Sequence, residues 1–232
     1  MNNTSSEPTL RVELHLHTRY SPDSLLPLET MVERARELGV DRVAVTDHNE
    51  IKGALAAKEL APDLVIVGEE VQTTVGELLG YFMTEKVPAG LPPKEAIQRL
   101  KAQGAVISVA HPFDKRGFKA WPWDELAELV PLLDAVEVFN SRCLAQDFNK
   151  QAQAFADAHG LAGTVGSDAH SSIELGMATL TMAPFQSAEE FRESLKTATA
   201  QVKASPPYVR LYSKHAKMTK LIQQASDPNS ES

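Results

Sequence analysis

Two histidines near the N-terminus have the spacing of a joint metal site. We predict a strand over residues 12–18, on which His15 and His17 share one face while Leu14 and Leu16 take the other. Imidazole is a common ligand of zinc, manganese and iron, and two imidazoles on one side of a strand converge on one point. The spacing therefore predicts a metal site, provided that other segments supply more ligands.

Histidines and carboxylates recur later in the chain, nearly all of them directly after an apolar segment. They are Asp23, His48, Glu70, His111, Asp168 and His170. Eight ligands with His15 and His17 exceed the roughly four to six that one ion takes. The pattern predicts two to three divalent ions of manganese, iron or zinc, with Glu70 as the carboxylate that bridges two of them.

The segments around these residues alternate between strand and helix patterns. After the strand at 12–18 we predict six more, with helices in most of the intervals, at 42–46, 64–67, 76–82, 105–110, 135–139 and 162–167. Short connections between alternating elements are typical of parallel β-α-β units. In a (β/α) barrel the C-terminal ends of the strands meet at one face, which would bring the predicted ligands together.

The composition limits the class of protein. A chain of 232 residues can bury the core of a barrel, and its net charge of −8 leads us to expect no stable binding of duplex DNA. The single cysteine, Cys143, cannot form an internal disulfide, which favours a cytoplasmic protein. No apolar run reaches the roughly 20 residues that cross a bilayer, so no membrane contact is expected, and the oligomeric state is left open.

The predicted domain organisation is a single α/β domain with short polar ends. Residues 1–9 are expected to be a disordered lead-in, 10–204 the barrel, 205–225 a C-terminal helix packed on or beside it, and 226–232 a disordered tail. The helix is basic, with Arg210, Lys214, Lys217 and Lys220. A charge run of this kind is usually a solvated face, and contact with nucleic acid is the alternative.

The motifs resemble those of the PHP family, the polymerase and histidinol phosphatase superfamily of metal-dependent phosphoesterases. The matching segments lie in the family's order within residues 11–180: His15-Leu16-His17-Thr18 with Ser21 and Asp23, Thr46-Asp47-His48-Asn49, Gly68-Glu69-Glu70, Ala110-His111-Pro112 and Gly166-Ser167-Asp168-Ala169-His170. The resemblance implies a distorted seven-stranded (β/α) barrel of the PHP type with a trinuclear metal centre.

The resemblance also implies how the ligands are shared among the ions. The groups are His15, His17, Glu70 and Asp168; Glu70 with His111; and Asp23, His48 and His170. Glu69 is the alternative to Glu70. Many family members place a further histidine or cysteine between the positions of His111 and Asp168, and here Asn140 or a water is the candidate for that ligand.

Other polar residues near the strand ends are candidates for catalysis and substrate binding. Arg142 is expected to clamp a phosphate, and its alternative is a surface arginine paired with Asp147. Arg19 and Arg116 are expected at the rim that binds substrate. Asp47 is expected to orient the neighbouring imidazole rather than to bind a metal.

The expected function is that of a metal-dependent phosphoesterase, which hydrolyses phosphate esters with a metal-activated hydroxide. The resemblance favours a small phosphorylated substrate, either a nucleotide or a short oligonucleotide. A histidinol-phosphate-type phosphomonoesterase is the alternative enzyme. A metal-binding regulatory or structural module is the alternative without catalysis.

Overall fold

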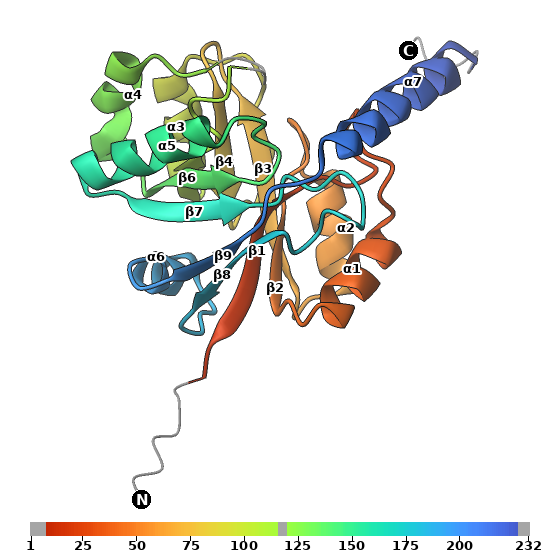
Figure 1. Cartoon of the computed structure of the whole chain (residues 1–232), viewed down its shortest axis with the longest axis horizontal. Helices are drawn as coiled ribbons and strands as arrows, with labels where there is room; N and C mark the ends of the chain where they lie inside the picture. Colours follow the sequence, from red (N-terminus) through yellow and green to blue (C-terminus); the bar gives the residue numbers. More distant parts are fainter. Residues whose placement is uncertain (1–7, 116–119, 227–232) are drawn as a thin grey trace, which may run out of the picture.

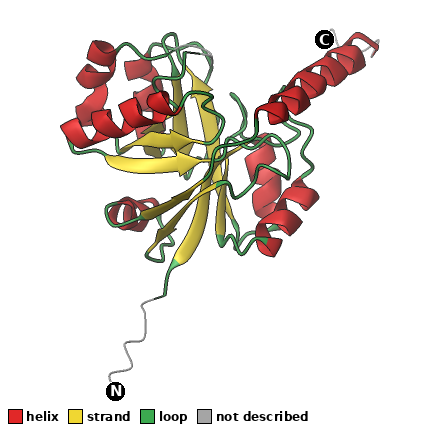
Figure 2. Cartoon of the chain, viewed as in Figure 1, coloured by secondary structure: helices red, strands yellow, loops and turns green. Residues whose placement is uncertain are grey.

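A computed structural model of the chain describes residues 8–115 and 120–226 (Figure 1). A twisted sheet runs through the centre, helices cover its outer side, and the last helix projects from the body (Figure 2). Arg116 and most of the predicted lead-in and tail lie outside the described residues. None of the helices in the described ranges is long and apolar enough to span a membrane.

The described elements alternate along most of the chain. In order they are β1 Leu10–Leu16, α1 Leu28–Glu37, β2 Arg42–Val45, α2 Lys52–Leu60, β3 Val65–Gln72, β4 Glu77–Tyr81, α3 Pro93–Ala102, β5 Val106–Val109, α4 Trp123–Leu129, β6 Ala135–Asn140, α5 Gln146–His159, β7 Ala162–Gly166, β8 Ala178–Met182, α6 Ala188–Leu195, β9 Thr199–Val202 and α7 Arg210–Ser226, with short 3₁₀ turns before β6 and α7.

The strands form one sheet in the order β7-β6-β5-β4-β3-β2-β1-β8-β9. Beyond the ends of β1 and β7, His17 N donates to Ala169 O and Asp168 N donates to His15 O, each at 2.8 Å. These bonds bring the two strands together and nearly close the sheet into a barrel. The C-terminal end of β1 therefore lies directly beside the end of β7.

The prediction of an α/β barrel is confirmed, but the prediction of seven strands was wrong. The described residues form nine strands, because β8 pairs antiparallel with β1 and β9 pairs antiparallel with β8. Neither β8 nor β9 was predicted, and every residue of β9 is exposed, so that strand lacks the apolar pattern of a buried strand. Strand β4 also departs from a regular β-α-β order, since it runs antiparallel to both β3 and β5. The predicted domain limits remain predictions.

Local sequence signals explain several element boundaries. Helix α1 buries Leu28, Met31, Val32 and Ala35 at helical spacing, and Gly39 follows it with a φ of 64°. Further along the chain, Gly160 ends α5 in the same left-handed conformation. Ser187 Oγ accepts a hydrogen bond from Glu190 N at 3.2 Å and thereby caps the start of α6.

Strand β1 is buried on both faces. On one face Leu14 and Leu16 are fully buried, and Leu16 belongs to the apolar cluster that includes Met31 of α1 and Ala54 of α2. On the other face Glu13 and His15 are also fully buried. Because buried polar groups are costly unless they are paired, this second face requires a network of partners.

Candidate metal centre

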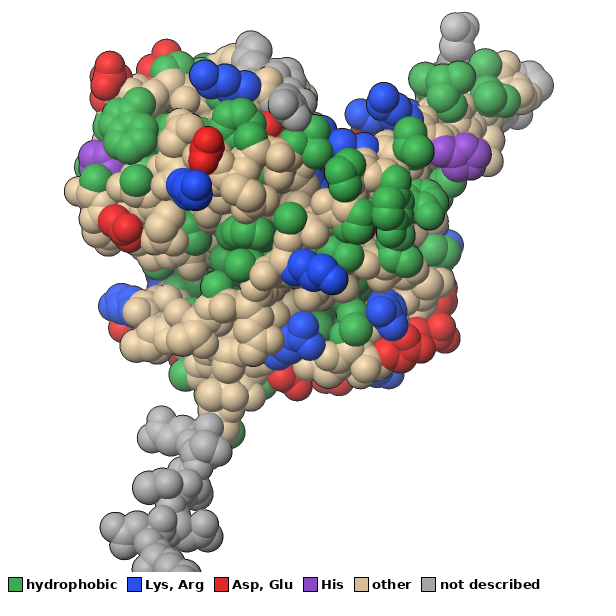
Figure 3. All heavy atoms as spheres, in the orientation of Figure 1, with side chains coloured by type: hydrophobic (Ala, Val, Ile, Leu, Met, Phe, Trp, Pro, Cys, Tyr) green, Lys and Arg blue, Asp and Glu red, His purple; other side chains and the backbone are tan. Residues whose placement is uncertain are grey.

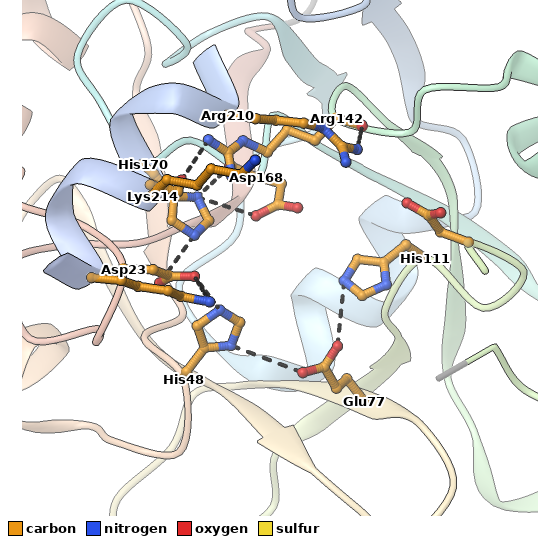
Figure 4. A pocket seen from close by; sticks show the side chains of 12 residues that line it. Asp23, His48, Glu77, His111, Arg142, Asp168, His170, Arg210 and Lys214 are labelled. Carbon is orange, nitrogen blue, oxygen red and sulfur yellow. Dashed lines mark hydrogen bonds and ion pairs between the residues drawn. The ribbon is translucent and has the colours of Figure 1, made fainter. Parts of the chain in front are cut away.

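The eight predicted ligands come together at one end of the sheet. His15 and Glu70 lie within β1 and β3, and the others follow β1, β2, β5 and β7. A cavity of about 520 Å³ is lined by five of the eight, Asp23, His48, His111, Asp168 and His170, while His15, His17 and Glu70 are buried (Figure 4). Glu77, which had not been singled out, lies at the same end because β4 runs antiparallel and thus begins where its neighbours finish. A glutamate at the start of a strand carries no sequence signal for this role, since the direction of β4 is set by its pairing.

Glu70 occupies the centre of the cluster. Its carboxylate lies 2.8 Å from His48 Nδ1, 3.0 Å from His111 Nε2 and 3.4 Å from the Nε2 atoms of both His15 and His17. It is also almost fully buried. One carboxylate that contacts four imidazoles from the ends of three strands has the position expected of a bridging ligand.

A second carboxylate set lies beside β7 and the loop after β1. Asp168 Oδ1 is 3.2 Å from His17 Nε2 and 3.5 Å from His170 Nδ1. Asp23 lies 3.2 Å from His170 Nε2 and 3.6 Å from His48 Nε2. Four groups of ligand atoms are compact enough to hold an ion, and Asp23 belongs to none of them. They are His17, His48 and His170; His15, Glu70 and His111; His15, His17 and Asp168; and His48, Glu70 and Glu77.

Two of the candidate ligands sit on strained backbone. His111 has a φ of 24° and Asp168 a φ of 53°, a region that residues other than glycine rarely adopt. Such strain persists only where the surrounding structure enforces it, and it is common at functional sites. Here it accompanies the turn of each side chain toward the cluster.

Glu137 is a further buried carboxylate that organises two of the histidines. Its Oε1 lies 2.9 Å from His15 Nδ1, and its Oε2 accepts from His111 N at 2.8 Å. A carboxylate on Nδ1 fixes the imidazole so that Nε2 faces the centre of the cluster. From the sequence no role was predicted for Glu137, because a glutamate inside an apolar strand becomes informative only when its partner strand is known.

Asp47 acts on the cluster through two hydroxyl residues. It accepts hydrogen bonds from Thr18 N and Oγ1 at 2.6 and 2.7 Å and from Ser21 Oγ at 2.8 Å. Ser21 Oγ in turn lies 3.1 Å from His17 Nδ1 and accepts from His48 N at 3.0 Å. Through Ser21, Asp47 thus reaches the ring of His17 and the backbone of His48, and its predicted effect on the His48 imidazole remains a prediction.

Asn140 and Glu69, the two alternative ligands, occupy different positions. Asn140 lies beside the cluster, with its amide nitrogen 3.3 Å from Asp168 Oδ2, while its amide oxygen accepts from Arg142 N at 2.9 Å. In this orientation the amide presents a donor to the cluster. Glu69 accepts from Val87 N at 2.9 Å and belongs to none of the compact ligand groups.

Charges within the cluster shift the pKa values of its members in both directions. Burial by itself raises the pKa of Glu70, but the adjacent His48 and His15 hold it well below its usual value. Burial, together with the neighbouring His170 and His48, lowers the pKa of His17 to about 3. Against the effect of burial, the adjacent Glu70 raises the pKa of His111 to about 10, and neighbouring carboxylates raise the pKa of His15 and His48 well above the usual value. Divalent cations would take the place of these protons, because imidazoles bind metals in the neutral form.

The directions of the polar atoms also fit cations. Glu70 Oε2 and Asp23 Oδ1 are buried without a hydrogen bond of acceptable geometry, although imidazole nitrogens lie 2.8 and 3.2 Å away. This is expected where ligand atoms aim at a shared ion rather than at each other. The set of histidine nitrogens and carboxylate oxygens suits manganese, iron or zinc. The assignment of individual ligands to individual ions remains a prediction.

Arg142 lines the cavity but is already engaged by the protein. Its Nε donates to Glu174 at 2.6 Å, and one terminal nitrogen donates to Ser213 Oγ of α7 at 2.9 Å. The alternative pairing with Asp147 is not present, since Asp147 pairs with Lys150 at 3.1 Å. Arg142 therefore lies at the cavity with part of its guanidinium already hydrogen-bonded to Glu174 and Ser213.

The basic C-terminal helix forms one wall of this cavity. Arg210, Lys214 and Lys217 of α7 line it, and Lys217 Nζ lies 3.4 Å from Asp23 Oδ2. Lys and Arg side chains gather where the projecting helix meets the body (Figure 3). Arg19, in contrast, is exposed, lies over the Tyr20 ring at 5.8 Å and is not among the lining residues.

Comparisons with known proteins agree with this architecture. The model of the PHP domain family matches residues 13–227, which include α7. The uncharacterized Methanocaldococcus jannaschii protein MJ0417 is 32% identical over 203 residues, which cover 83% of this chain and 82% of that protein.

Two solved structures show the same fold at low sequence identity. A two-domain Bacteroides vulgatus protein containing a predicted PHP-like metal-dependent phosphoesterase has a TM-score of 0.71 and 20% identity, and the match covers 84% of this chain and 65% of that one. The lesion-specific endonuclease PfuEndoQ from Pyrococcus furiosus has a TM-score of 0.63 and 17% identity, with 86% and 60% covered. This chain thus spans less than two thirds of the length of either protein.

Proposed function

Because the chain belongs to the PHP domain family, whose characteristic activity is metal-dependent phosphoester hydrolysis, we propose that it hydrolyses phosphate esters of nucleotides or short oligonucleotides. The observation that carries the proposal is the position of Glu70, a buried carboxylate that contacts four imidazoles, two of which, His48 and His111, line an open cavity. A purely structural histidine cluster would have no need of a cavity in front of it.

The residues of the floor would hold two to three divalent ions. The groups are those around His15, His17 and Asp168; around Glu70 and His111; and around Asp23, His48 and His170. When bound, such cations stabilise negative charge on phosphoryl oxygens and make hydroxide available from water near neutral pH. This chemistry requires no serine, cysteine or histidine nucleophile.

The protein's own side chains would hold the ligands and the phosphate in place. Glu137 and Ser21 fix the ring orientations of His15 and His17, so their Nε2 atoms stay directed at the centre. Arg142 offers the part of its guanidinium that Glu174 and Ser213 leave free to a phosphoryl oxygen. Arg19 is a weaker candidate for substrate contact, since it is not among the residues that line the cavity. Arg116 lies outside the described residues, and its contact with substrate stays a prediction.

The size and charge of the cavity favour a nucleotide over a smaller ester. A volume of about 520 Å³ lies within the roughly 300–1,000 Å³ of small-molecule sites. Similarity of fold to a lesion-specific endonuclease also supports a substrate derived from nucleic acid. Histidinol phosphate is the alternative substrate, since its single phosphate would bind to the same metal ions. The alternative to an enzyme is a metal-binding module without catalytic activity.

The test combines elemental analysis with a substrate screen on the full chain. We expect two to three manganese, iron or zinc ions per chain after loading, and hydrolysis of nucleotides or short oligonucleotides in preference to histidinol phosphate. Faster hydrolysis of histidinol phosphate would contradict the proposed nucleotide substrate and support the alternative phosphomonoesterase. Bound ions without turnover on any ester would support the metal-binding module instead.

A further inference from the structure

The cavity has two sides of opposite chemistry. Its floor carries histidines and carboxylates, and its wall carries Arg142 together with Arg210, Lys214 and Lys217 of α7 (Figure 4). The floor accounts for the binding of cations and, through them, of one phosphate. The positively charged side chains of the wall are not required to bind either the metal ions or this phosphate.

Two of the wall cations already have a carboxylate partner. Arg142 donates to Glu174 at 2.6 Å, and Lys217 lies 3.4 Å from Asp23. Lys214 differs, because its ammonium has neither a hydrogen bond nor an ion pair with any residue that the structure describes. Arg210 donates one guanidinium nitrogen to the carbonyl oxygen of Arg142 and has no carboxylate partner in the described ranges.

The spacing of these cations carries an electrostatic cost. Arg210 and Lys214 are four residues apart on α7, and Lys214 and Lys217 are three apart, so each pair of like charges lies on neighbouring turns. Like charges at these spacings destabilise a helix. No carboxylate of α7 offsets them, since the helix from Arg210 to Ser226 contains no aspartate or glutamate. A bound anion would remove this repulsion.

We propose that Lys214, assisted by Arg210, forms an anion subsite that binds a second phosphate group of the substrate, apart from the phosphate held at the floor. This proposal rests on the proposed function and narrows its substrate class to esters that carry a second phosphate, such as the end of an oligonucleotide. The helix supplies the subsite because its basic face is the wall of the cavity. Lys214 thereby determines specificity, and it takes no part in the bond cleavage.

The experiment isolates the charge of the second phosphate. Two 5′-phosphorylated dinucleotides are compared as inhibitors of p-nitrophenyl phosphate hydrolysis by the metal-loaded chain. One has a normal phosphodiester linkage and the other an uncharged methylphosphonate linkage of nearly the same shape. We expect the charged dinucleotide to have an inhibition constant about tenfold lower, as for one hydrogen bond to a charged group.

Substitution assigns the effect to the helix. In Lys214→Gln the ratio of the two inhibition constants should fall toward one. The control is Lys150→Gln, which removes the same charge from an exposed lysine on α5 and should leave the ratio as it is in the unmodified chain. Equal inhibition by both dinucleotides, or an unchanged ratio in Lys214→Gln, would overturn the subsite.

Failure of the proposed function is a separate outcome. If the metal-loaded chain hydrolyses no phosphate ester, the two dinucleotides are titrated onto it by calorimetry, which measures the subsite without turnover. Tighter binding of the charged dinucleotide that depends on Lys214 would support the subsite even then. Equal binding of the two would reject it.

Discussion

The strand ends and helix α7 line the same cavity, but the protein holds them in different ways. His15 and His17 are fully buried at the strand ends, and each is oriented by a further side chain. Along α7 only Ala216 is buried, and Met218 is 57% exposed. The helix is attached largely through polar contacts, such as those of Lys217 with Asp23 and of Lys220 with the backbone oxygens of residues 19 and 21. Fixed ligands suit ions with strict geometry, whereas long exposed cations suit a substrate that varies.

The largest effect should follow from removing a ligand at the floor. His15→Ala should reduce phosphoester hydrolysis by about a thousandfold or more, because several kcal/mol of charge stabilisation depend on the cations. It should also lower the number of bound ions in elemental analysis. The control is His159→Ala on α5, a histidine that packs against Phe155 outside the cluster. Full metal content with full activity in His15→Ala would refute the assignment of the floor.

A smaller effect is expected when a ligand is retained but the residue that orients it is changed. Glu137→Gln removes the charge that holds His15 Nδ1 and should weaken metal affinity by about 10- to 100-fold. The measurement is a metal titration by calorimetry, with Glu128→Gln on α4 as the exposed control. Unchanged affinity would show that burial alone positions the histidine.

The tight packing at the floor gives a prediction for stability. A Cβ at Gly166 would lie 2.3 Å from the Cβ of His15 and 2.5 Å from Glu137 Oε1. Gly166→Ala should therefore destabilise the fold by about 1–3 kcal/mol, the usual cost of overpacking. Denaturant unfolding measures the change. A stabilised variant would mean that β1 and β7 can separate freely at this point.

The smallest effect is expected on α7. Met218→Ala should change the free energy of unfolding by no more than about 0.5 kcal/mol, because the side chain is mostly exposed. Met31→Ala on α1 is the matched substitution in the core, where the side chain is 0% exposed, and should cost about 2–5 kcal/mol. Similar losses for the two methionines would show that another surface covers α7.

Sequence alone predicted most of the elements and the ligands that follow them. Strands buried on both faces read as short apolar runs, and the ends of β1, β2, β5 and β7 are marked by histidine or aspartate. It predicted neither β8 nor β9; the latter is an exposed edge strand, which has no burial pattern. The partner of Arg142 was also not predicted, since Glu174 lies 32 residues away and is brought near only by folding.

The sequence by itself determined which residue types could hold metal ions and that they would gather at strand ends, because strand periodicity and position along the chain are local properties. Only the tertiary structure decided that Glu70 contacts four imidazoles, that Glu77 joins the floor and that Glu137 supports two ligands. The sequence favoured a solvated face for the basic helix, and only the tertiary structure showed that this helix forms a wall of the cavity. These features depend on strand pairing and helix docking, which bring together residues that no local pattern relates.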